Sequence, residues 1–228
     1  QIKGQPVNLE GYGYIYNKAY FEDAGITQTP RTFSELEGAA EQLQSAGYTP
    51  FATGYGEWWV VGLHLMNVPF AMQDDPQAFV DGLMDGTETM AGNPRFEELK
   101  DIIDLNVEYG ENNPLTTANN EQTQLFIAGE TAMMQQGNWK EIVIMGADAG
   151  MDVGVFPIPL NDDMDTSNRL PIGVPFYFVV NNSSSERTQE AARTFLNWQV
   201  SSEEGKNWQT ERFGYIPAYG DIEPVGLG

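Results

Sequence analysis

The stretch from Leu125 to Trp139 constrains the fold more than any other part of the sequence. The residues before Gly129 are typical of a short helix, and Gly129 is expected to end it in the left-handed conformation, which glycine adopts without a Cβ clash. Residues 131–134 are apolar and short enough for a buried strand. Asn138 is then expected to cap a second helix, which begins at Trp139. The pattern predicts a buried strand that delivers a tryptophan to its carboxyl end.

In open α/β sheets, small ligands bind at the carboxyl edge of the strands, so Trp139 is a candidate ligand residue. The alternative is that Trp139 belongs to the core, and this stretch by itself favours neither interpretation. A second aromatic segment, residues 54–59, follows a strand expected over residues 48–52. Tryptophan stacks efficiently on apolar faces, so Trp58 and Trp59 are further candidates, although burial of one of the pair in the core is a serious alternative. We expect Trp59 to line the open face and Trp58 to be more buried.

The net charge of the chain is −22, from 33 acidic and 11 basic residues. Such a field repels nucleic acids and anionic lipid, and it suits a neutral or cationic ligand. The chain has no cysteine, which excludes disulfides, thiolate metal sites and cysteine nucleophiles. The only histidine, His64, lies among apolar residues and is expected to be a hydrogen-bonded core residue. No metal-binding or cofactor motif is expected.

Two acidic residues, Glu10 and Glu57, lie near the ends of expected strands and beside aromatic residues. A glycoside hydrolase needs two carboxylates that flank the scissile bond, so this pair keeps an enzyme interpretation open.

Three segments together resemble a known family. Residues 14–36 run from Tyr-Ile-Tyr-Asn-Lys to a helix whose expected capping box is Thr32 with Glu35, and Phe33 replaces the tryptophan usual in the family. Residues 126–139 carry the Phe-x-x-Gly-Glu-Thr-Ala-Met pattern followed by Gly-Asn-Trp, and residues 178–217 match as well. This combination resembles the family 1 extracellular solute-binding proteins of ABC sugar importers, the maltose-binding-protein type.

The resemblance implies an α/β, periplasmic-binding-protein-like fold of type II. The chain would hold mostly the C-terminal ligand lobe plus a remnant of the N-terminal lobe. The implied organisation is a crossing strand over residues 1–12, the ligand lobe over residues 13–165, a crossing strand and returning piece of the other lobe over residues 170–217, and a tail over residues 218–228. Apolar side chains of the returning piece would then fold back on the ligand lobe, pair with a second copy in self-association, or stay mobile.

The resemblance also implies a sugar or oligosaccharide ligand, ABC importer membrane subunits as partners, and no catalysis and no cofactor. The expected location is extracellular or periplasmic, with a lipid anchor on an N-terminal cysteine that lies outside this chain. A glycoside hydrolase-like domain and a binding protein for a cationic or peptide solute remain as alternatives. The candidate ligand-binding residues are Glu10, Tyr12, Glu57, Trp58, Trp59, Asn138, Trp139, Phe176 and Tyr177.

Overall fold

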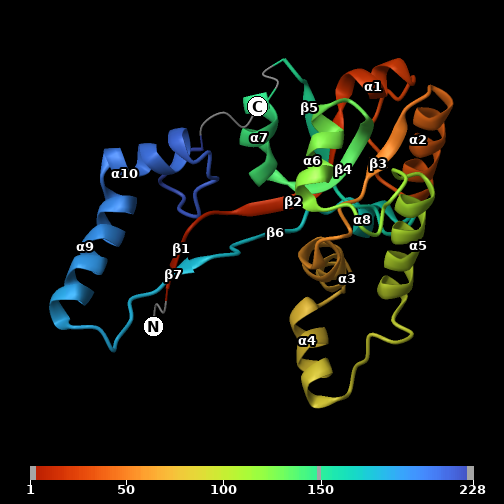
Figure 1. Ribbon diagram of the computed structural model, residues 1–228. Helices are drawn as coiled ribbons and strands as arrows, with labels where there is room; N and C mark the ends of the chain where they lie inside the picture. Colours follow the sequence, from red (N-terminus) through yellow and green to blue (C-terminus); the bar gives the residue numbers. More distant parts are fainter. Residues whose placement is uncertain (1–3, 148–149, 225–228) are drawn as a thin grey trace. The chain divides into compact units, whose positions relative to one another are not determined.

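The computed structural model describes residues 4–147 and 150–224, and the chain divides into two compact units. Unit 1 consists of residues 1–11 and 172–228, and unit 2 consists of residues 12–171. The chain therefore passes between the units twice, once after Gly11 and once after Pro171. The fold is α/β, as the sequence predicts, with helices arranged around a mixed sheet (Figure 1).

The sheet of unit 2 has the strand order β3-β4-β2-β5. β3 (Thr49–Ala52) runs parallel to β4 (Thr131–Gly137), and β2 (Glu10–Asn17) runs antiparallel to both β4 and β5 (Val153–Phe156). Every residue of β4 is buried, so the predicted buried strand is confirmed, and it extends as far as Gly137.

Helices and short helical turns complete unit 2. Helix α6 packs against β3 and β4, and α2 packs against β3. Asn138 does not cap the second helix as predicted, because it is itself the first residue of a 3₁₀ turn. The helical elements of unit 2 are α1 (Lys18–Asp23), α2 (Phe33–Ser45), the π-helix η1 (Val60–Leu65), α3 (Met66–Ala71), α4 (Pro76–Asp85), α5 (Pro94–Glu108), α6 (Asn119–Ile127), the 3₁₀ turn η2 (Asn138–Lys140), α7 (Glu141–Ala147) and α8 (Met164–Ser167).

The core of unit 2 is centred on Tyr14, whose side chain is fully buried. Its ring lies 5.6 Å from that of Phe51 and 5.4 Å from that of Phe156. The Tyr14 hydroxyl donates to Asn106 Oδ1 at 2.9 Å, and Asn106 Nδ2 donates to the Tyr55 hydroxyl at 2.7 Å. Burial raises the pKa of both phenols, so they stay protonated and satisfied within an otherwise apolar core.

The turn between α6 and β4 depends on a glycine. Gly129 has a φ of +74°, so the predicted left-handed helix end is confirmed. A Cβ at this position would also meet the hydroxyl of Tyr20, which donates to the Gly129 carbonyl oxygen at 3.1 Å. Glycine is therefore required both by the backbone conformation and by the close approach of Tyr20.

Unit 1 contains short strands and two helices followed by a π-helical turn. Its elements are β1 (Gln5–Pro6), β6 (Ile172–Gly173), β7 (Tyr177–Phe178), α9 (Glu186–Ser201), α10 (Glu203–Asn207) and the π-helix η3 (Trp208–Arg212). β1 pairs antiparallel with β7, and β6 pairs antiparallel with Glu10 and Gly11. The segment after residue 170 forms two short strands, β6 and β7, and Pro175 lies in the gap between them, since proline has no N–H to donate to a ladder.

Helix α9 belongs to the returning piece, and its apolar side chains are not covered by a core within the described residues. None of its residues is buried, and Phe195 is 54% exposed. Phe195 instead stacks on Trp198 of the same helix, with ring centroids 5.9 Å apart. The helical pattern itself is confirmed, since Ser185 caps the helix by accepting from the Thr188 N–H.

Within residues 4–147 and 150–224, no helix combines the length and the apolar character needed to cross a bilayer. The same part of the chain has no group of three or more acidic or histidine side chains placed to hold a metal ion.

Candidate functional site

One edge of the unit 2 sheet gathers segments that are far apart in the sequence. Because β3 and β4 are parallel, with Ala52 opposite Met134, the residues that follow both strands emerge at the same edge. β2 is antiparallel to β4 and places Tyr12 opposite Gly137, so the beginning of β2 lies at this edge too. The predicted convergence of the segments after β3 and β4 at one carboxyl edge is thus a consequence of the sheet register.

Three aromatic rings surround the imidazole of His64 at this edge. We call the four side chains, Tyr12, Trp59, His64 and Trp139, the aromatic cluster. The His64 ring stacks on Tyr12 with centroids 4.9 Å apart. Trp139 lies 4.8 Å from it, and Trp59 approaches it edge-on at 5.2 Å. Trp59 and Trp139 are both partly buried. The residue that the sequence analysis assigned to the core is therefore the one that joins three predicted ligand residues.

Two buried polar atoms of the cluster, the Tyr12 hydroxyl and His64 Nδ1, lack hydrogen-bond partners among the described residues. His64 is 9% exposed, and its Nδ1 is buried without a hydrogen bond, so the predicted hydrogen-bonded core histidine is only half right. Burial lowers the pKa of His64 to about 4. Tyr12 is also buried, and its hydroxyl has no hydrogen-bond partner. Burial raises the pKa of Tyr12 to about 12. Both rings are neutral near pH 7.

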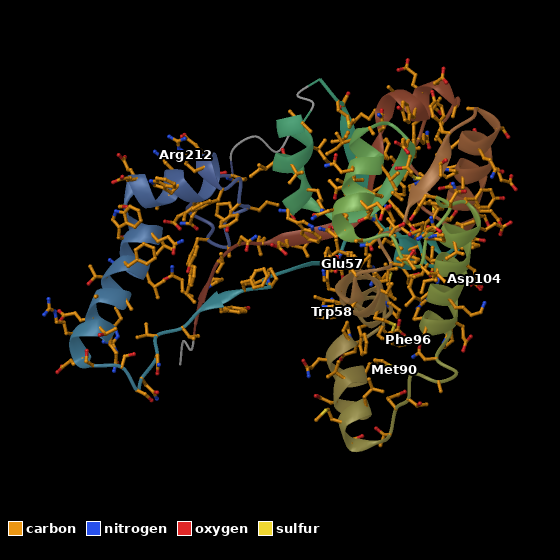
Figure 2. The ribbon with its side chains drawn as sticks, in the orientation of Figure 1. Glu57, Trp58, Met90, Phe96, Asp104 and Arg212 are labelled. Carbon is orange, nitrogen blue, oxygen red and sulfur yellow. The ribbon has the colours of Figure 1, made fainter. Side chains whose placement is uncertain are left out.

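The segment before η1 carries the predicted pair of tryptophans, and the pair is the reverse of what was expected. Trp58 is 75% exposed, whereas Trp59 is partly buried in the aromatic cluster. The prediction that Trp58 would be the more buried of the two is wrong, because the rings of Trp59 and His64 pack together and leave Trp58 outside. Figure 2 shows Trp58 beside Glu57 in the segment that leads into η1.

A network of hydrogen bonds holds the indole ring of Trp139 in place. The indole Nε1 of Trp139 donates to Gln136 Oε1 at 2.9 Å. Gln136 Nε2 donates to Gln122 Oε1 at 2.6 Å and to Asn119 Oδ1 at 3.2 Å. Gln122 Nε2 in turn donates to the carbonyl oxygen of Ala52, at the end of β3. The network thereby ties the ends of β3 and β4 to α6, and we call it the amide network.

A buried lysine, Lys140, completes the amide network. Its Nζ donates to Asn119 Oδ1 at 2.6 Å and to Thr123 Oγ1 at 2.7 Å. Burial lowers the pKa of Lys140 to about 8. The backbone N–H of Asn119 donates to Glu57 Oε1 at 3.4 Å, so the carboxylate sits at the first residue of α6.

Sequence reasoning missed five residues at this edge: His64, Asn119, Gln122, Gln136 and Lys140. A signal existed for Lys140, since it is a basic residue next to the candidate Trp139 in a chain with only 11 basic residues. For His64, the five-residue spacing from Trp59 fits the turn of a π-helix, but sequence patterns are read at helical period 3.6.

Not all predicted site residues lie in unit 2. Glu10, Phe176 and Tyr177 belong to unit 1, where Phe176 is 61% exposed and Tyr177 is 58% exposed. Asn8 Nδ2 donates to Glu10 Oε1 at 3.1 Å. Asn138 is partly buried between Gly137 and the candidate Trp139. The structure therefore brings together Tyr12, Trp59 and Trp139, with Glu57 and Trp58 on the adjoining segment. The remaining candidates are Asn138, next to Trp139 in unit 2, and Glu10, Phe176 and Tyr177 in unit 1.

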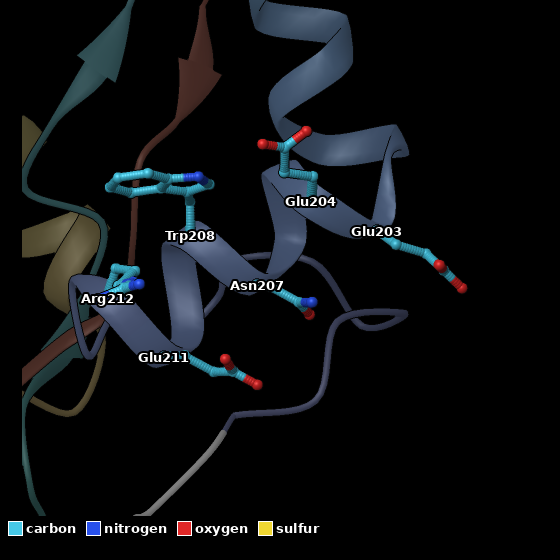
Figure 3. A pocket seen from close by; sticks show the side chains of 6 residues that line it. All are labelled: Glu203, Glu204, Asn207, Trp208, Glu211 and Arg212. Carbon is cyan, nitrogen blue, oxygen red and sulfur yellow. The ribbon is translucent and has the colours of Figure 1, made fainter.

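Unit 1 has a surface hollow of about 330 Å³, which Figure 3 shows. Its walls come from α10 and η3, and the guanidinium of Arg212 lies 5.8 Å from the ring of Trp208. The remaining lining side chains are Glu203, Glu204, Asn207 and Glu211. The hollow is open and acidic and carries none of the predicted site residues.

The chain matches the family of bacterial extracellular solute-binding proteins over residues 2–206. This match covers most of the 228 residues. The chain belongs to this family. Membership of this family does not favour the glycoside hydrolase alternative that the sequence analysis kept open.

Named relatives agree with the family. The chain is 29% identical, over 160 residues, to an uncharacterized ABC transporter extracellular-binding protein of Pyrococcus horikoshii, and it covers 35% of that protein. Among solved structures, it resembles a chitin oligosaccharide binding protein with a TM-score of 0.78 and 26% identity, covering 98% of this chain and 56% of the other. A Bifidobacterium animalis subsp. lactis binding protein in complex with mannobiose gives a TM-score of 0.76 at 23% identity, covering 99% and 54%.

These comparisons establish a periplasmic-binding-protein-like fold, as the resemblance in the sequence implied. The chain spans about half the length of the solved relatives and about a third of the Pyrococcus protein.

Proposed function

We propose that this chain binds a neutral oligosaccharide outside the cell, for delivery to an ABC importer without chemical change. The observation that carries the proposal is the aromatic cluster around His64, next to the exposed ring of Trp58 and the carboxylate of Glu57. Aromatic rings stack on the C–H faces of sugars, and a carboxylate accepts hydrogen bonds from their hydroxyls.

The electrostatics support a ligand without negative charge. The net charge of −22 repels anions at long range, whereas it leaves a neutral sugar unaffected. His64 and Tyr12 are neutral near pH 7, so the cluster offers rings rather than charges. Two of the solved relatives are a chitin oligosaccharide binding protein and a binding protein in complex with mannobiose, which supports an oligosaccharide as the ligand.

The proposal assigns roles to the two units. Unit 2 would be the ligand lobe, and unit 1 would contain the crossing strands and a returning piece of the second lobe. Ligand capture would then follow the hinge closure that brings two lobes together around a solute. The fit of the whole chain to solute-binding structures supports this assignment.

The glycoside hydrolase alternative needs a second carboxylate beside Glu57. The other predicted carboxylate, Glu10, belongs to unit 1 and is hydrogen-bonded to Asn8. A cationic solute is the remaining rival, because the negative field would attract it. Both rivals are separate outcomes of the following test.

The test is calorimetric titration of the full chain with chito-, manno- and raffinose-type oligosaccharides, and with spermidine as the cationic rival. We expect one oligosaccharide class to bind, and expect both Trp58→Ala and Trp139→Ala to weaken that binding. Reducing ends are followed in the same samples. Binding of spermidine alone would contradict the sugar proposal, and steady product release that is lost in Glu57→Gln would identify a hydrolase instead.

The family is extracellular, and its relatives include an ABC transporter binding protein. The proposal therefore includes importer membrane subunits as partners and, in its finer form, a lipid anchor on the full-length protein. Mass spectrometry of the protein isolated from its native membranes tests the anchor.

A further inference from the structure

Lys140 is a buried cation without an anionic partner. It is 6% exposed, and it makes no ion pair with a carboxylate in the part of the chain that the structure describes. Burying a charge is costly unless hydrogen bonds compensate it, and Lys140 has two short ones, to Asn119 and Thr123. An apolar side chain at this buried position would cost less free energy of folding than a charged one. The presence of a lysine here therefore calls for an explanation other than core packing.

The donor and acceptor pattern of the amide network provides that explanation. A lysine ammonium can only donate, so Asn119 must turn its Oδ1 toward it. That oxygen also accepts from Gln136, which must therefore present its Nε2 on this side. The opposite end of the Gln136 amide is then an oxygen, and this oxygen accepts from the indole N–H of Trp139. An indole can only donate, so each bond in the series has one allowed direction.

We propose that Lys140 is a positioning residue of the candidate sugar site: its ammonium anchors Asn119, Asn119 Oδ1 holds Gln136, and Gln136 holds the Trp139 ring. The inference rests on the proposed function for its role in binding, but its structural part does not depend on the ligand. Lys140 acts through Asn119 and Gln136 and does not itself contact the sugar.

The same residue links the two kinds of ligand contact in the proposed site. Asn119 binds Lys140 through its side chain and Glu57 through its backbone N–H. At the other end of the series, Trp139 lies 4.8 Å from the His64 ring, at the centre of the aromatic cluster. Removing the ammonium should therefore loosen the stacking ring and shift the end of α6 on which the carboxylate rests.

The groups around Lys140 allow its titration to be distinguished from that of His64. Asn119 and Thr123 on α6 face it and carry no charge. Glu57 reaches the backbone of Asn119, and Glu141, whose pKa is raised by burial, follows Lys140 in the chain. Burial lowers the pKa of Lys140 to about 8, well away from the value of about 4 for His64.

The first experiment follows the indole ¹⁵N–H resonance of Trp139 in the ligand-free full chain, assigned by its absence in Trp139→Phe. We expect it to titrate with a midpoint near pH 8 in the wild type. This titration should disappear in Lys140→Arg, because the guanidinium stays charged. In Lys140→Met the Trp139 indole resonance should shift, and the indole N–H should exchange faster with solvent. Lys100→Met, an equal charge change on the exposed face of α5, should alter nothing.

The second experiment measures oligosaccharide affinity in the same proteins. Lys140→Met should weaken binding roughly tenfold, the equivalent of one lost hydrogen bond to a positioned ring, and Lys140→Arg should restore part of it. A Trp139 resonance that is unchanged in both Lys140 variants would overturn the inference, as would wild-type affinity in Lys140→Met. If the wild type binds no oligosaccharide, the proposed function fails, and the resonance experiment still decides the role of Lys140.

Discussion

The rings of Tyr12 and His64 lie nearly parallel, 4.9 Å apart and inclined by 18°. Tyr12 comes from β2 and His64 from the π-helix η1, so the stack joins a strand to a helix at the edge where the sheet ends. Neither the Tyr12 hydroxyl nor His64 Nδ1 has a hydrogen-bond partner among the described residues. The imidazole is buried there, and the stability of the fold therefore depends on its neutral form.

This dependence predicts a loss of stability in mild acid. The unfolded chain takes up a proton on its histidine near pH 6.5, whereas the folded chain resists until about pH 4. The stabilising contribution of neutral His64 is therefore complete above pH 6.5 and is lost as the pH falls toward 4. We expect the loss to reach roughly 2–3 kcal/mol of unfolding free energy.

The control for that prediction is His64→Phe, which keeps a ring and removes the titration. The carboxylates titrate in both proteins, so the difference in unfolding free energy between them isolates the imidazole. It is measured by urea denaturation from pH 7.5 to pH 4. A difference that stays constant over this range would show that His64 is not held neutral by the fold.

Trp58 is predicted to matter for binding and not for stability. Its ring is 75% exposed, so Trp58→Ala should change the unfolding free energy by less than about 0.5 kcal/mol. Oligosaccharide affinity should fall roughly 3–10-fold, as expected for one lost aromatic contact. Leu63→Ala, at another exposed apolar position close in sequence, is the matched control and should leave affinity unchanged. Equal affinities of Trp58→Ala and wild type would remove Trp58 from the site.

Substitution of Gly54 is predicted to destabilise the protein because an added Cβ would disturb the amide network. Its φ is +65°, and a Cβ would lie 2.6 Å from Oε1 of the buried Gln122. Gly86 has a φ of +82° with nothing within 4 Å of a Cβ, so Gly86→Ala measures the backbone cost alone. We expect Gly54→Ala to cost about 1–3 kcal/mol more than Gly86→Ala in denaturant unfolding. Equal costs would mean that Gln122 moves aside freely.

Helix α9 is predicted to open more readily than the unit 2 sheet. None of its residues is buried, whereas every residue of β4 is. In hydrogen exchange at low protein concentration, amides of residues 191–198 should exchange much faster than those of residues 131–134. Slowing of the α9 amides as the concentration rises would reveal self-association through its exposed apolar side chains, of which Phe195 is the largest exposed one. Equal slow exchange in a monomer would mean that α9 has a complete core of its own.

The local elements followed from the sequence because their causes are local. Gly129 ends a helix since only glycine adopts its conformation without strain, and Thr32 caps α2 through the N–H of Glu35. The apolar run at residues 131–134 had to be buried, and it is the central strand β4. The family pattern extends this local information, which is why the fold class was predictable as well.

What the sequence by itself determined is the set of strands and helices and the edge at which their aromatic residues emerge. The tertiary structure decided which side chains meet there: that Trp59 turns inward and Trp58 outward, and that His64 joins Tyr12 to Trp139. It also decided that Lys140 and Gln136 both donate to the same oxygen of Asn119. These choices depend on contacts between segments far apart in the sequence, such as Tyr12 with Gly137, which are 125 residues apart. Only the register of β2 against β4 and the π-helical turn of η1 set such contacts, and neither leaves a periodic mark in the sequence.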